Sequence, residues 1–229
     1  MKNCIIMASL FLSIAASSAV YAQQRLDYLG QAGVGAVLYR APEAPKLPYG
    51  FEGTQYVYSE KFEEGTLRYN DVTYSGISLN LNANADELHI MVPTSMVVLE
   101  LDKRWVEWFT MGEKKFIAAG GKNRFEGLQE GYYQILHNGE GMLLKKHIKR
   151  IKVTKHEVKG IYREFEPLER YYAVKDGVAF QVARKGDLMK LYAGQKRAVK
   201  EMLKKSGGTL NGKENRERLF TAIMKVVDK

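Results

Sequence analysis

The sequence predicts an α+β protein: an antiparallel β-rich domain (a sandwich or an open barrel-like sheet) followed by two C-terminal amphipathic helices. In the middle of the chain, apolar and polar residues alternate with a period of two, most clearly over Ile77–Asn84. Short apolar runs there are separated by turn signals rather than by helical crossovers, which favours antiparallel pairing. After Asp187 the apolar residues recur with the period of a helix.

The first 22 residues have the features of a secretory signal peptide. Lys2 precedes a mostly apolar run over Cys4–Ala16 that is too short to span a bilayer. Small residues at Val20 and Ala22 predict cleavage after Ala22, so that Gln23 would begin the mature chain. The only cysteine would leave with this segment, so no thiol chemistry is expected afterwards. We therefore expect an exported protein, located in the periplasm or associated with the outer membrane.

Residues 23–50 predict an irregular lead-in, in which Pro42, Pro45 and Pro48 favour an extended strap. The β domain is expected over residues 51–183. Its further strands are predicted over short runs bounded by glycines or charges: Glu87–Val92, Ser95–Leu101, Trp105–Thr110, Lys115–Ala118 and Tyr132–Leu136.

Two tight turns predict β-hairpins. Asn138-Gly139 joins the strand over Tyr132–Leu136 to Met142–Leu144. Asp176-Gly177 joins Tyr171–Lys175 to Val178–Val182 in the same way.

Residues 145–167 interrupt the strand pattern. Seven Lys and Arg residues lie between Lys145 and Lys159, with Glu157 as the only acid, and the apolar residues there keep no single strand register. We expect a long basic excursion from the sheet, facing either solvent or an anionic partner. The candidate binding residues in it are Lys149, Arg150, Lys152 and Lys155.

The last segment, 184–229, predicts a helical pair packed on the β domain. Asp187 is expected to cap a helix that runs to Lys205 and stops at Gly207-Gly208. Asn211 is expected to cap the second helix.

The order of these patterns resembles a family of exported β-rich proteins common in Bacteroidota. The residues that carry the likeness are Leu79-Asn80-Leu81-Asn82, Asp86-Glu87-Leu88, Phe116-Ile117 and Gly131–Leu136. The resemblance implies export and this architecture, and it carries over no catalytic residue.

Motifs for catalysis and metal binding are missing from the sequence. It has no Gly-x-Ser-x-Gly, no His-Glu-x-x-His and no phosphate loop, so we predict no enzymatic activity and no cofactor. The four histidines lack the spacing of zinc ligands, which predicts no metal site. Asn80, Asn82, Asn84 and Asp86 are expected to line a solvent-facing strand rather than a calcium site.

Two tryptophans are weaker binding candidates. Trp105 and Trp108 lie three apart on one predicted strand, so their side chains are expected on opposite faces. One would then pack in the core and the other could meet a partner.

Charge and hydropathy restrict the partner class. The net charge is +9, or +8 without Lys2, which favours an envelope protein or an anionic lipid or glycan surface; export argues against nucleic acid. The best later membrane candidate, Met91–Leu101, is too short to span a bilayer and contains Pro93 and Glu100.

These patterns predict a non-catalytic exported envelope protein, acting as a binding or accessory module for another envelope component. Two alternatives stay open at this point. A lipid or lipoprotein carrier would enclose an apolar cavity, and a hydrolase would assemble an active site that no motif signals.

Overall fold

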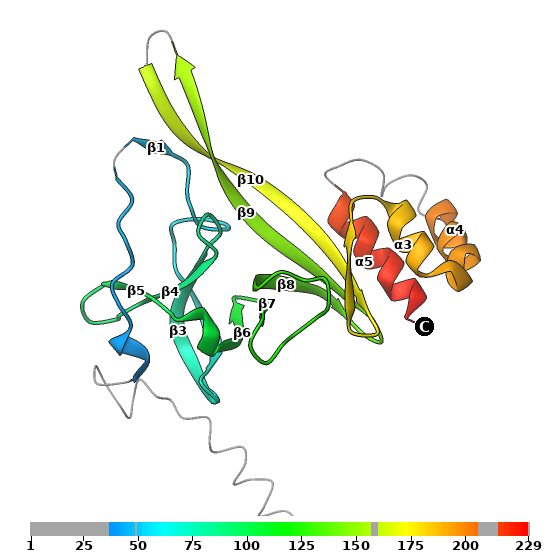
Figure 1. Cartoon of the computed structure of the whole chain (residues 1–229), viewed down its shortest axis with the longest axis horizontal. Coiled ribbons are helices and arrows are strands. Elements are labelled where there is room, and N and C mark those ends of the chain that lie inside the picture. Colours follow the sequence, from blue (N-terminus) through cyan, green and yellow to red (C-terminus); the bar gives the residue numbers. More distant parts are fainter. Residues whose placement is uncertain (1–36, 49, 157–159, 206–214, 229) are drawn as a thin grey trace, which may run out of the picture.

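The computed structural model describes residues 37–48, 50–156, 160–205 and 215–228. The predicted signal peptide with Ala22, most of the lead-in and the predicted cap at Asn211 lie outside the described residues. The described chain forms one large, mostly antiparallel open sheet with helices at its C-terminal end (Figure 1), which confirms the predicted α+β class.

The sheet has eleven strands in the order β1-β10-β9-β8-β7-β6-β2-β3-β4-β5, and β11 also pairs with β10. Among the strand pairs that the structure describes, only the pair of β1 with β10 is parallel. The strands are β1 Phe51–Glu52, β2 Glu63–Tyr69, β3 Val72–Asn82, β4 Glu87–Met91, β5 Val98–Glu100, β6 Val106–Met111, β7 Lys114–Ala119, β8 Gly131–Asn138, β9 Met142–His156, β10 Gly160–Lys175 and β11 Val178–Val182. The helices are η2 Val37–Arg40, η3 Lys103–Trp105, α3 Lys185–Leu191, η4 Ala193–Gln195, α4 Lys196–Lys205 and α5 Arg216–Val227.

One core lies between strands β2 to β8. Phe109 stacks on Phe116 with ring centroids 4.9 Å apart, and the Tyr132 ring meets Phe109 edge-on at 5.5 Å. All three side chains are buried. Gly65 lets β2 cross close to β6, because a Cβ there would lie 1.8 Å from the carbonyl oxygen of Thr110.

A second core joins the helices to the sheet. Tyr171 of β10 meets Phe220 of α5 edge-on at 5.2 Å, and Leu188 of α3 and Val199 of α4 are buried in the same cluster. The helices therefore cover the end of the sheet formed by β8 to β11 (Figure 1).

The predicted continuous helix from Asp187 to Lys205 is wrong in detail. The chain bends at Tyr192, which is buried in the second core, and turns through η4 before α4 begins. Asp187 is not the N-cap but the third helical residue, where its carboxylate accepts hydrogen bonds from the backbone of Ala183 and Arg184. The bend lets both short helices bury an apolar side chain.

Both predicted hairpins are confirmed: β8 pairs with β9, and β10 pairs with β11. Asp176 and Gly177 both have positive φ, as the tight turn between β10 and β11 requires.

The predicted solvent-facing polar strand is wrong, because Asn80 and Asn82 are only 3% and 4% exposed. The segment before β2 covers them. The Asn80 amide donates to the backbone carbonyl groups of Ser59 and Lys61, and Tyr56 forms a bridge with Asn82. The Asn80 amide is satisfied by this preceding segment and the Asn82 amide by Glu87 and the following turn, which the alternation in β3 does not reveal.

The predicted irregular excursion over residues 145–167 is also wrong. Strands β9 and β10 pair in unbroken antiparallel register from His156 opposite Gly160 to Met142 opposite Val174. Pro167 is accommodated in β10 because the backbone groups of this position point away from β9. The missing N–H therefore removes no hydrogen bond between β9 and β10. Figure 1 shows the two strands projecting as a long hairpin beyond the rest of the sheet.

Candidate functional site

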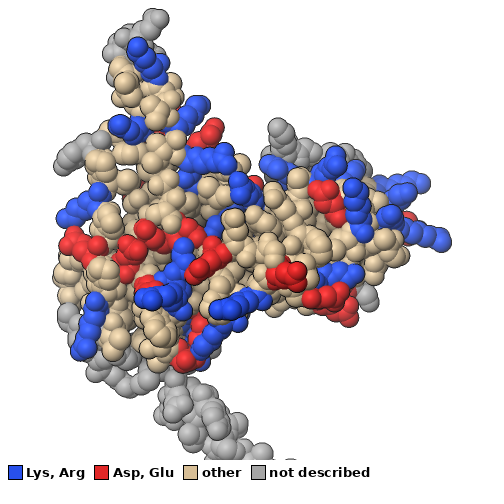
Figure 2. All heavy atoms as spheres, in the orientation of Figure 1, with Lys and Arg blue, Asp and Glu red and all other residues tan. Residues whose placement is uncertain are grey.

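The hairpin formed by residues 149–156 of β9 and 160–167 of β10, here called the arm, contains all four basic candidate residues. Strand β8 pairs with β9 only as far as Lys145. In Figure 2 basic side chains follow the arm outwards, whereas most of the acidic side chains in view lie lower on the body. The arm is thus a paired, cationic projection.

The arm has two chemically different faces. Side chains alternate along a strand, and cross-strand partners share a face. The mixed face consists of Lys149, Ile151, Val153 and Lys155 of β9 with Ile161, Arg163, Phe165 and Pro167 of β10. The charge-paired face consists of Arg150, Lys152 and Thr154 with Tyr162, Glu164 and Glu166.

On the charge-paired face each cation lies opposite a carboxylate. Lys152 is the register partner of Glu164, and Arg150 that of Glu166. Opposite charges at such positions attract each other across the strands. This face is therefore close to electrically balanced.

The mixed face carries three cations and has no acidic member among its described residues. Val153 and Ile161 are 63% and 66% exposed, and Ile151 is 44% exposed. Exposed aliphatic groups beside unbalanced cations are typical of a contact surface rather than of a solvated loop.

The lower end of the mixed face is covered by β1. Phe51 stacks on Phe165 with ring centroids 5.2 Å apart, and the Arg163 guanidinium lies over the Phe51 ring at 5.8 Å. Phe165 is consequently buried. The uncovered part of this face lies towards the tip.

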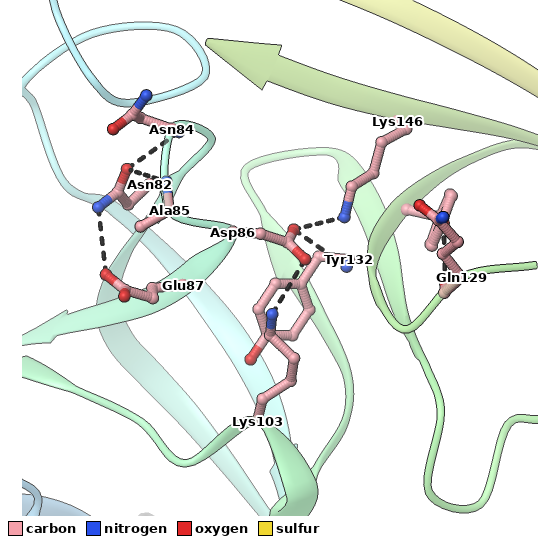
Figure 3. A network of polar contacts seen from close by, with 10 residues as sticks. Asn82, Asn84, Ala85, Asp86, Glu87, Lys103, Gln129, Tyr132 and Lys146 are labelled. Carbon is pink, nitrogen blue, oxygen red and sulfur yellow. Dashed lines mark hydrogen bonds and ion pairs between the residues drawn. The ribbon is translucent and has the colours of Figure 1, made fainter. Parts of the chain in front are cut away.

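The turn between β3 and β4 supports the base of the arm through Lys149. The Lys149 N–H donates to the Ala83 carbonyl at 2.9 Å, and the Asn84 amide donates to the Lys149 carbonyl at 2.8 Å. Asn82 shapes this turn, because its side-chain oxygen accepts from the backbone N–H groups of Asn84 and Ala85 at 3.1 and 3.2 Å (Figure 3).

Asp86 ties the same turn to β8 and β9 (Figure 3). Its carboxylate accepts hydrogen bonds from the ammonium groups of Lys103 and Lys146 and from the Tyr132 N–H. Gly131 has a φ of +146°, and a Cβ there would lie 2.2 Å from Lys146 Nζ and 2.3 Å from this carboxylate, so a side chain would displace both groups. Burial lowers the pKa of Lys146, and Asp86 opposes that shift. Asp86 thus compensates two cations that β9 and η3 bring together.

The other side of the base contains a second polar cluster. The Lys145 ammonium lies 2.5 Å from Glu169 and 2.7 Å from Glu217 of α5. His147 Nε2 is 2.7 Å from the side-chain oxygen of Gln134. Burial, and after it the charge of Lys145, lowers the pKa of His147 to about 3, so the ring is neutral near pH 7.

The seven basic residues of the predicted excursion therefore divide by position. Lys145 and Lys146 are engaged at the base in ion pairs with carboxylates from other elements. Arg150, Lys152 and Lys155 are exposed on the arm. Lys149 is partly buried, and its side chain lies on the mixed face. Lys159 lies outside the described residues.

The two tryptophans do not join this surface. Trp105 belongs to η3 rather than to a strand and is half exposed, and it lines a cleft of about 200 Å³ that contains no residue of the arm. Trp108 of β6 packs against a third cluster on the sheet, with the Lys115 ammonium 5.1 Å from its ring. The prediction that both lie on one strand is wrong, because the chain turns through η3 before β6 begins.

A buried hydrogen-bonded chain is the strongest candidate for chemistry. Tyr56 OH lies 3.2 Å from His89 Nδ1, and His89 Nε2 lies 3.3 Å from Glu87. Burial lowers the pKa of His89 and raises that of Tyr56 to about 12. A nucleophile needs the opposite shift, so this arrangement positions His89 in the fold and does not activate Tyr56. The adjoining cleft, about 450 Å³, contains both rings in its lining.

Sequence reasoning missed the uncharged and supporting members of the arm. Ile151 and Val153 gave a usable signal, since β-branched residues two apart favour a strand. The supporting role of Asn84 and Asp86 had no local signal, because their partners are 65 and 60 residues away.

Among the described residues no helix has the length and apolar character needed to cross a membrane. No protein-family model matches the sequence, and neither a curated protein nor a solved structure gives a match.

Proposed function

We propose that the chain is an exported, non-catalytic binding or accessory module that holds another component of the cell envelope. The contact surface is the mixed face of the arm, and the partner presents an acidic protein surface. The observation that carries this proposal is the contrast between the two faces: one is balanced by cross-strand carboxylates, and the other combines three cations with exposed aliphatic side chains.

The free-energy cost of exposing the mixed face to water supports a binding role. Unbalanced cations on a narrow hairpin repel each other, and exposed aliphatic groups lose free energy in water. An acidic partner with apolar side chains would offset both costs. The hydrogen bonds that Lys149 makes with Ala83 and Asn84 and the ion pairs of Asp86 support the base, so that little order has to be gained on binding.

Protein is favoured over lipid by the mixed face itself. Three exposed aliphatic side chains lie among the cations there, and the backbone beside them is an open strand edge that hydrocarbon could not satisfy. The carrier alternative gains no support from the first core, whose interior is filled by Phe109, Phe116 and Tyr132.

The test is co-sedimentation of the mature protein with envelope membranes from the producing cells. The arm variant carries Lys149→Gln, Lys155→Gln and Arg163→Gln, which removes the three cations of the mixed face. The matched control removes three exposed cations from α4: Lys196→Gln, Lys200→Gln and Lys204→Gln. We expect the parent and the control to sediment at low salt, and the arm variant to remain in solution.

High salt sharpens the result. Near 1 M salt the screening length falls to about 3 Å, so retention through exposed charges should disappear for the parent as well. Equal sedimentation of the arm variant and the control would overturn the proposal. Export is tested separately by mass analysis of the mature N-terminus, which we expect at Gln23; an intact Met1 on envelope material would contradict it.

A further inference from the structure

The outer backbone edge of β9 is open along the arm. Lys149 directs its N–H and its carbonyl away from β10, towards Ala83 and Asn84. Backbone groups alternate in direction along a strand, so Ile151, Val153 and Lys155 direct theirs the same way. Within the described residues, β9 beyond Lys149 pairs only with β10. Three N–H groups and three carbonyl groups therefore form an unpaired edge.

The turn between β3 and β4 already provides one backbone bond at this edge. Ala83 and Asn84 contact Lys149 at the place that a neighbouring strand would occupy. An extended segment placed beyond them would continue the same row of hydrogen bonds along 151, 153 and 155. This is the geometry of recognition by strand addition.

The side chains beside the edge determine what such a segment contains. On the mixed face, Ile151 and Val153 offer apolar contact to the neighbouring strand. On the charge-paired face, Arg150 and Lys152 have a carboxylate on the β10 side and are exposed on the other. The complementary strand places aliphatic residues beside Ile151 and Val153 and an acidic residue beside Lys155 on the first face, and Asp or Glu beside Arg150 and Lys152 on the second.

The same features disfavour a second copy of this chain. Pairing two β9 edges would bring the cations of both copies together, and like charges across strands are destabilising.

We propose that an extended peptide segment alternating aliphatic and acidic residues adds as a strand to the open edge of β9. This inference rests on the proposed function of the arm and names its partner class and its mode of binding. Side chains determine specificity, while the main-chain bonds at 151, 153 and 155 provide the docking geometry.

The test measures binding of labelled peptides to the mature full-length protein by fluorescence anisotropy. The probe is a peptide of about eight alternating valine and glutamate residues, close to the usual length of a strand. A valine–lysine peptide of the same length is the charge control. Two further probes carry N-methyl groups, one on every valine amide and the other on every glutamate amide, because only one of these sets can face β9.

We expect the valine–glutamate peptide to bind and the valine–lysine peptide not to bind. One methylated peptide should bind like the parent, and the other should lose at least about tenfold in affinity, since several main-chain hydrogen bonds are removed. Equal binding of both methylated peptides, or loss of both, overturns strand addition.

A variant of the protein gives an independent test. Val153→Pro removes one outward N–H without removing a bond to β10, and Val153→Ala shortens the side chain but keeps the N–H. We expect the proline variant to lose peptide binding and the alanine variant to keep most of it. The N-methylated peptides keep the inference testable in case the proline variant does not fold.

The outcomes separate this inference from the proposed function. Arm-dependent sedimentation together with no binding of the valine–glutamate peptide overturns strand addition and leaves the proposed function standing. Sedimentation that does not depend on the arm, together with no binding of the valine–glutamate peptide, overturns both. Arm-dependent binding to phosphatidylglycerol vesicles in place of the peptide overturns strand addition in favour of a lipid surface.

Discussion

The body formed by β2 to β8 and the arm use the same antiparallel pairing, but they are held in place by different forces. In the body the apolar side chains of the strands are buried in a shared core, as Leu79 and Phe109 show. On the arm beyond Lys149 the exposed side chains lie on both faces, and support comes from the β10 ladder, from β1 and from the β3–β4 turn. Burial therefore determines the sequence pattern of the body, whereas the arm is free to present charge and aliphatic groups outwards.

The largest expected effect comes from the body. Phe109→Ala removes a fully buried ring that contacts Phe116 and Tyr132, and should lower the free energy of unfolding by about 3–5 kcal/mol. Urea denaturation measures the change. Val153→Ala on the exposed arm is the matched control and should stay within about 0.5 kcal/mol of the parent. Similar losses of stability for both variants would contradict the difference in burial between the body and the arm.

The junction between the two regions should be sensitive to pH through His147. Its pKa is lowered to about 3 in the folded protein, so between pH 6.5 and 3 the unfolded chain binds the additional proton. The contribution of His147 to the free energy of unfolding is fully present above pH 6.5. It decreases as the pH falls, by about 1.4 kcal/mol per pH unit.

The measurement compares denaturation midpoints of the parent and His147→Gln between pH 7 and about pH 4.5, near the carboxylate range. The variant does not titrate at this position, so the parent should lose about 2–3 kcal/mol relative to it. A constant difference across this interval would show that the histidine is not held neutral.

Asp86→Asn tests the support at the base of the arm. Asparagine tolerates the positive φ of this position, so the change removes the charge and leaves Lys103 and Lys146 without it. We expect a loss of about 1–3 kcal/mol in unfolding free energy. Hydrogen exchange should accelerate at Lys149, whose N–H is bonded to the turn that carries Asp86. Unchanged protection there would mean that the turn does not support the arm.

Ile161→Ser should have the smallest effect on the fold. This side chain is 66% exposed on the mixed face, so the melting temperature should change by no more than about 2–4 °C, the shift expected for 1 kcal/mol or less. Binding to envelope membranes should nevertheless weaken, because an aliphatic contact is lost. A large drop in melting temperature would show that the arm packs against more than the described residues reveal.

Local chemistry was sufficient to predict much of the fold. Alternation predicted β3 and its buried side chains at Ile77, Leu79 and Leu81, and the Asp176-Gly177 turn predicted the hairpin between β10 and β11. These features depend on a period or on a turn conformation that a few neighbouring residues specify. The arm was predicted incorrectly for the corresponding reason. A strand with two exposed faces shows no alternation of apolar and polar residues, so its lysine-rich sequence was interpreted as a loop.

By itself, then, the sequence determined the α+β class, both hairpins and the presence of amphipathic C-terminal helices. Only the tertiary structure decided which polar groups are free. Asn80 is buried because the segment before β2 crosses it, and Lys145 and Lys146 are paired with Glu217 and Asp86, which lie 72 and 60 residues away. Whether a polar or charged group is exposed depends on residues that are distant in the sequence and close in the fold. The local periodicity of the sequence does not indicate which residues these are.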